Sequence, residues 1–196
     1  MNNIDNLKKK IMGIISKSSV PEDPIHAINT LEWLLKMDPE ADEALRIAAL
    51  GHDIERAMEN RKVRREEFAD FIAFKKAHAI NSANVLKELM TRYGIDKGLM
   101  DDVYGLVCCH ETGGDPRSDL LRDADSLSFF HKNLPMFFDR EGPERAFERC
   151  IWGYERLSPE ARDRVKGFSY NNEELSLIVT TVFRKAPNKY SEGVCE

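Results

Sequence analysis

The sequence predicts an all-α protein, folded as a single-domain helical bundle over residues 1–196. Apolar residues recur three or four positions apart along most of the chain, as Ile4, Leu7 and Ile11 do near its start, and this spacing is typical of an amphipathic helix. No segment shows the strict alternation of apolar and polar residues that marks a half-buried strand. Turn-forming pairs such as Asp38-Pro39 separate the periodic segments, so we expect helices joined by short turns.

The first expected helices lie between clear breaks. Pro24 suits a first helical position and Asp23 an N-cap, which predicts a helix over residues 24–37. An alanine-rich stretch predicts the next helix over residues 41–58. Further on, a long pattern over residues 65–92 forms one helix or two.

The remaining helices follow in the same way. We expect one over residues 97–109 that ends at His110, and one over residues 119–132 capped by Ser118. The C-terminal helices lie within residues 143–186, at 143–157, 159–166 and 173–184. Residues 187–196 are expected to form a loose tail.

The composition is typical of a globular protein and disfavours binding to nucleic acid or to a membrane. The chain has 42% hydrophobic and 32% charged residues, as ordinary globular proteins do. Its formal net charge of −5 lacks the basic excess of nucleic-acid-binding proteins. The apolar run at residues 11–15 is too short for a membrane span or a secretory signal, so we expect a cytoplasmic protein without a membrane partner. A homo-oligomer is compatible with the sequence.

The histidines form the pattern that carries chemistry. Of five in the chain, four lie in separate expected helices or at their ends, namely His26, His52, His78 and His110. Each follows the one before by about one helix-turn-helix unit, so antiparallel helices would bring them to a common level. Asp53 adjoins His52, and Asp125 offers a further carboxylate. Imidazole and carboxylate ligands without cysteine suit one or two divalent ions, of Mn, Fe, Mg, Ni, Co or Zn.

These residues resemble the signature of the HD superfamily of metal-dependent phosphohydrolases. The order His26, His52-Asp53, Asp125 matches, and the local runs over residues 48–54 and 123–127 look like that family's motifs. The resemblance covers residues 24–130 and implies a helical bundle of the HD type with an ion held by these four residues. In the second run it implies Asp125, rather than Asp123, as the ligand.

Two further positions resemble the binuclear members of this superfamily. His78 and His110 would hold a second ion, and Asp53 would bridge the two. With a single ion, His78 and His110 would instead bind a phosphate group of the substrate.

The expected activity is that of a phosphomonoesterase or phosphodiesterase. By the same resemblance its substrate would be a small anionic phosphate ester such as a nucleotide, cleaved by attack of a metal-bound hydroxide on phosphorus. The residues expected to act in catalysis are Asp53 and Arg56. Arg56 lies four residues after His52 in the expected helix, on the same face, where its guanidinium would pair with phosphate. Lys75 shares a face with His78 and is a weaker candidate for the same task, whereas Glu55 is expected at the surface.

Two other functions fit the same residues. The six-ligand pattern also resembles the di-iron oxygenases of the superfamily, in which the metals activate dioxygen. A non-catalytic module that binds a metal or a nucleotide is the third alternative.

Overall fold

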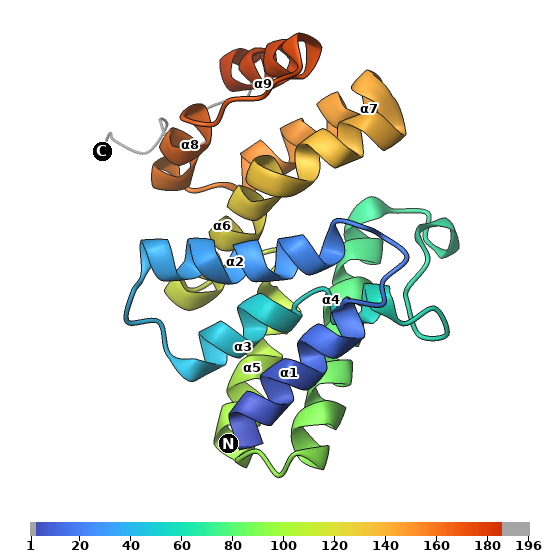
Figure 1. Ribbon diagram of the computed structural model, residues 1–196, viewed down its shortest axis with the longest axis vertical. Coiled ribbons are helices and arrows are strands. Elements are labelled where there is room, and N and C mark those ends of the chain that lie inside the picture. The colour runs from blue at the N-terminus through green and yellow to red at the C-terminus, as the bar shows by residue number, and fades with distance from the viewer. Residues whose placement is uncertain (1–2, 186–196) are drawn as a thin grey trace, which may run out of the picture. The chain divides into compact units, whose positions relative to one another are not determined.

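The computed structural model describes residues 3–185, and every regular element in that range is helical (Figure 1). The all-α prediction is therefore confirmed. The chain divides into two compact units, residues 1–125 and residues 126–196. The single-domain organisation stays a prediction, and the expected tail over residues 187–196 lies outside the described residues. Among the described residues, no helix is long and apolar enough to cross a membrane.

In the described residues, the first unit is built from six longer helices and two short 3-10 turns. Helix α4 packs along α5, α5 packs against α3, and α3 packs against α2, while α1 contacts α2, α3 and the turn η1 (Figure 1). The fully buried side chains at these contacts include Leu7, Leu34, Ile47 and Leu86. In chain order the elements are α1 (Asn3–Ile15), α2 (Asp23–Met37), α3 (Glu43–Gly51), η1 (Ile54–Ala57), η2 (Arg65–Glu67), α4 (Phe71–Arg92), α5 (Lys97–Cys109) and α6 (Pro116–Ser128), the last of which continues into the second unit.

Aspartate caps fix where three of these helices begin. The side chain of Asp42 accepts a hydrogen bond from the backbone N–H of Leu45 at the start of α3. Asp70 does the same for the first turn of α4, and Asp96 for that of α5. An N-cap of this kind satisfies donors that the helix leaves without a partner. Local chemistry thus sets the register of the three helices that contain or precede His52, His78 and His110.

The helix expected over residues 41–58 is shorter than predicted. Helix α3 ends at Gly51, and Ile54–Ala57 forms the 3-10 turn η1. Between them Asp53 has φ −105° and ψ 12°, which is outside the helical region and turns the chain. Ile54 is completely buried after this turn. Tertiary packing therefore overrides the helix propensity of the residues that follow Asp53.

Other helix boundaries differ less from the prediction. Residues 65–92 form two helices, η2 and α4, which was one of the two alternatives. Asp23 is the first residue of α2 and not its cap. Ser118 lies inside α6, where its hydroxyl donates to Asp115 instead of capping the helix.

The second unit contains the π-helix η3 (Phe129–Asn133), α7 (Leu134–Arg156), α8 (Pro159–Lys166) and α9 (Glu173–Lys185). Gly142, with φ +83°, interrupts α7, and the helix restarts at Pro143 as the sequence predicts. Helix α9 packs against α7.

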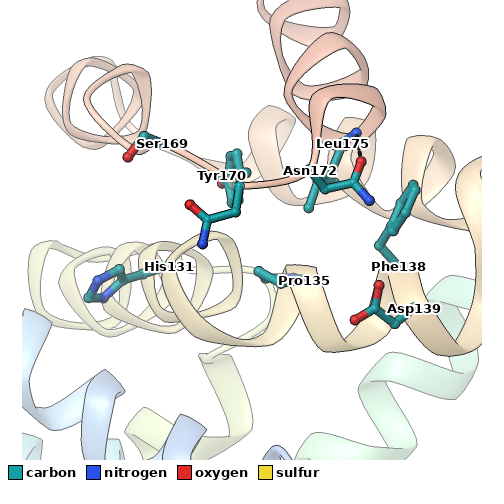
Figure 2. A pocket seen from close by; sticks show the side chains of 9 residues that line it. His131, Pro135, Phe138, Asp139, Ser169, Tyr170, Asn172 and Leu175 are labelled. Carbon is teal, nitrogen blue, oxygen red and sulfur yellow. Dashed lines mark hydrogen bonds between the residues drawn. The ribbon is translucent and has the colours of Figure 1, made fainter.

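A cavity of about 300 Å³ lies within the second unit. Figure 2 shows His131, Pro135 and Phe138 on the side formed by η3 and α7, with Tyr170 and Asn172 opposite. The Tyr170 hydroxyl donates a hydrogen bond of 2.9 Å to the carbonyl oxygen of Phe130. None of the metal ligands expected from the sequence lines this cavity.

Gly51 tests the packing of α3 against α4. A Cβ added there would lie 2.7 Å from a methyl carbon of the fully buried Leu86, whereas a Cβ at the exposed Gly13 meets nothing within 4 Å. Both changes to alanine favour the helix, but Gly51→Ala also overpacks the core, so we expect it to be less stable than Gly13→Ala by about 1–3 kcal/mol. Urea denaturation of the two variants measures the difference. Equal free energies of unfolding would show that Leu86 moves aside freely.

Candidate metal centre

Four helices bring four histidine side chains together in the first unit. His26 lies in α2 and His78 in α4, while His52 and His110 directly follow α3 and α5. Their side chains are at most 4% exposed. Ring centroids are 5.1 Å apart for His26 and His52, 5.1 Å for His52 and His110, and 5.6 Å for His78 and His110. The grouping expected from their spacing in the sequence is thus present.

Asp53 lies among these four rings. Its Oδ1 atom is 2.8 Å from Nε2 of His78 and 3.8 Å from Nε2 of both His52 and His110. Its Oδ2 atom is 3.9 Å from Nε2 of His26. One carboxylate therefore faces the Nε2 atoms of all four histidines.

Asp125, near the end of α6, completes a second set of donor atoms. Its Oδ1 is 3.0 Å from Nε2 of His26 and 3.5 Å from Nε2 of His52, and the two nitrogens are 3.2 Å apart. Ligands about 2.1 Å from one ion lie about 3.0–3.4 Å from each other. The spacing of these three atoms therefore fits a single ion. Asp123 is also buried, but it belongs to none of the groups of donors that could hold a metal.

Within residues 3–185, three groups of possible metal donors can be distinguished, each with donor atoms within 4.8 Å of one another. They are His26, His52 and Asp125; Asp53, His78 and His110; and His110, Glu111 and Asp125. All six ligands expected from the sequence belong to these groups. Glu111 was not expected, although it follows His110 directly, as Asp53 follows His52. That repeated pairing of histidine with an acidic residue is the signal in the sequence that points to it.

The imidazole rings of His52 and His110 are oriented by the helices that precede them. Each residue is a helix C-cap, and Nδ1 donates to the carbonyl oxygen three residues earlier, of Ala49 at 3.1 Å and of Val107 at 2.7 Å. A carbonyl oxygen only accepts, so the proton resides on Nδ1 in both rings. Nε2 is then the atom available to a metal, and both Nε2 atoms face Asp53.

A buried glutamate orients His78 in the same sense. Glu55 is only 1% exposed and accepts hydrogen bonds from Nδ1 of His78 at 2.6 Å, from the Asn81 amide at 2.9 Å and from the Val63 backbone at 2.7 Å. The expectation of a surface residue was wrong, because α3 ends at Gly51 and η1 turns Glu55 inward. Glu55 leaves Nε2 of His78 directed at Asp53.

Arg56 reaches the cluster from η1 rather than along a helix face. Its guanidinium lies 2.9 Å from Oδ2 of Asp53 and 3.1 Å from Oδ1 of the buried Asp23. The side chain is 35% exposed, so it joins the buried cluster to the surface. Its contact with a substrate phosphate stays a prediction. Asp23 was expected only as a helix cap; burial raises its pKa, against the opposing charge of Arg56.

Neighbouring charges shift the pKa values of the residues in this cluster. Burial alone would raise the pKa of Asp53, but His52, Arg56 and His78 hold it well below its usual range. Burial would likewise lower the pKa of His52, but the carboxylates of Asp53 and Asp125 outweigh it and raise the pKa to about 9. At neutral pH an ionised Asp53 therefore faces a protonated His52. A divalent ion would have to displace this proton.

The comparison with protein families covers most of the chain. A family described as a domain of unknown function, DUF4202, matches residues 1–178. The chain belongs to the DUF4202 family. The matched region includes every residue of the three donor groups. Neither the curated proteins nor the solved structures contain a significant match to this chain.

Glu55 provides a test of the orientation of His78. Glu55→Gln keeps the size of the side chain but replaces a charged acceptor of the His78 Nδ1 proton, so we expect metal affinity to fall about 10-fold to 100-fold. The matched control is Glu59→Gln, because Glu59 is exposed and its carboxylate contacts Ser19 and Lys62, away from the histidines. Isothermal titration with Mn²⁺ measures both variants. Equal affinities in the two would contradict the role of Glu55.

The raised pKa of His52 predicts how metal affinity depends on pH. Below about pH 9 the ion competes with a proton on His52, so affinity should rise about tenfold for each pH unit and level off above that pKa. Titrations in buffers of different ionisation enthalpy count the protons released. An affinity that is constant from neutral pH to pH 9 would show that His52 is not a ligand.

Proposed function

We propose that this chain is a metal-dependent phosphohydrolase of the HD type that cleaves a small phosphate ester. The observation that most supports it is the position of Asp53, whose two carboxylate oxygens lie within 3.9 Å of the Nε2 atoms of four buried histidines. Nitrogen and oxygen donors without thiolate suit Mn, Fe, Mg, Ni, Co or Zn. In this proposal the donor groups would hold one ion or two.

A bound divalent ion would supply an activated water and offset negative charge on phosphoryl oxygens. The protein's own residues orient the imidazole ligands and keep the Asp53 carboxylate ionised. The backbone carbonyls of Ala49 and Val107 hold two imidazoles by their Nδ1 protons, and Glu55 holds a third. Arg56 keeps Asp53 ionised, because its positive charge lowers the pKa of that carboxyl.

The cations beside the donors favour an anionic substrate. Arg56 is the most exposed of the charged side chains around Asp53, and its guanidinium has the planar donor geometry that suits phosphate. Lys75 is a second cation near His110, through its ion pair with Glu111. In this proposal Arg56 orients the phosphate group toward the donors while remaining bound to Asp23.

Substitution of Asp53 tests the assignment of the centre. Asp53→Asn removes the charge shared by the donors, so metal content should drop and phosphate release should fall by at least about 100-fold. Asp123→Asn is the matched control, since Asp123 is a buried aspartate of the same chain outside the donor groups, and it should retain metal. Elemental analysis gives the metal content. Phosphate release is measured with phosphomonoesters, cyclic dinucleotides and nucleotides in the presence of Mn²⁺, Co²⁺, Ni²⁺ or Mg²⁺.

The outcomes separate the proposal from its alternatives. Oxygen uptake by the iron-loaded protein without phosphate release from any ester would contradict the proposed phosphohydrolase and indicate an oxygenase. Tight binding of nucleotide or metal without any turnover would indicate a non-catalytic binding module. Full metal loading of the Asp53→Asn variant would contradict the assignment of Asp53 to the metal centre.

A further inference from the structure

Lys75 and Glu111 form a buried ion pair beside the donor groups. Lys75 lies in α4, one turn before His78, and Glu111 directly follows His110. The side chains are 12% and 4% exposed, respectively. Charges this deeply buried are unfavourable unless each is compensated, so the pair requires a reason beyond its own attraction.

One oxygen of Glu111 has two neighbours. Oε1 contacts the ammonium of Lys75 and also lies 3.4 Å from Nε2 of His110. That separation is the distance between two ligands of the same ion. The Nδ1 proton of His110 is held by the carbonyl of Val107, so Nε2 is the atom that faces the carboxylate. The oxygen that binds Lys75 is thus placed to bind a metal together with His110.

We propose that Glu111 is a ligand of an ion held together with His110 and Asp125, and that Lys75 holds its carboxylate until that ion binds. This inference rests on the metal centre of the proposed function. A divalent cation takes over Oε1 of Glu111 from an ammonium of lower charge, and the carboxylates of Glu111 and Asp125 then balance the charge of the ion. Lys75 is therefore a competitor of the metal, and the exchange makes occupancy of this position depend on metal concentration.

The exchange has a consequence that a purely structural ion pair lacks. Loss of Glu111 removes a ligand and weakens binding of this ion. Loss of Lys75 removes the competitor and strengthens binding. The two partners of one ion pair thus have opposite effects on metal affinity, whereas breaking a structural pair from either side would only destabilise the fold.

The test is a titration of the chain of residues 1–196, purified without metal, with Co²⁺, followed by calorimetry and by the visible absorption of the bound ion. We expect Glu111→Gln to weaken Co²⁺ binding at the site of His110, Glu111 and Asp125 by about 10-fold or more and to change the absorption spectrum of the bound ion. Lys75→Met should bind the same ion more tightly than the unchanged protein. Glu88→Gln, which breaks an exposed ion pair with Arg61, is the matched control and should bind Co²⁺ as the unchanged protein does.

Each result has a distinct meaning. If the unchanged protein binds Co²⁺ and Glu111→Gln binds it with the same affinity and spectrum, Glu111 is not a ligand and this inference alone fails. If Lys75→Met binds Co²⁺ more weakly than the unchanged protein, Lys75 does not compete with the metal for Glu111. This measurement is independent of whether Glu111→Gln folds. If the unchanged protein binds no metal ion, the proposed function fails as well. Thermal melting of each variant separates lost ligands from lost structure.

Discussion

The cluster depends on one interaction, the burial of the Asp53 carboxylate among four imidazoles and a guanidinium. A carboxylate in a protein interior tends to take up a proton, because burial disfavours its charge. Here the positive charges of His52, Arg56 and His78 hold its pKa well below the usual range. Asp53 in turn contributes to the raised pKa of His52 and His78. The helices must therefore bring these groups together at once, since any one of them left alone in the interior would be unfavourable.

The fold solves this problem with short-range devices that repeat. His52 and His110 each stand at the C-cap of a helix and donate Nδ1–H to the carbonyl oxygen three residues before. These carbonyls lie in the last turn of each helix, so each bond fixes the imidazole ring to the helix end and orients it. Helix ends directed at a common centre thus set the geometry of the ligands. His78 lies within α4, and its Nδ1 donates to the carboxylate of Glu55 instead.

The sequence predicts much of this arrangement, and its failures have physical causes. Periodicity and turn residues place most helices, and the order of His26, His52-Asp53, His78, His110 and Asp125 marks a donor set that the structure brings together. The end of α3 was missed because the residues after Asp53 favour a helix and only packing prevents one. Glu55 and Glu111 were missed because a glutamate in isolation is usually a surface residue, and only tertiary partners reveal a buried one.

The early end of α3 decides the chemistry of the residues that follow it. Had the helix continued, Glu55 and Arg56 would point about 100° apart around one axis, and Arg56 would lie a turn above His52. In the 3-10 turn η1, Glu55 instead enters the interior to hold His78, while Arg56 binds Oδ2 of Asp53 from the surface side. Consecutive residues thereby supply an anion that orients one imidazole and a cation that keeps the central carboxylate ionised. The departure from helix geometry after Gly51 is therefore what lets a single short segment act on both sides of Asp53.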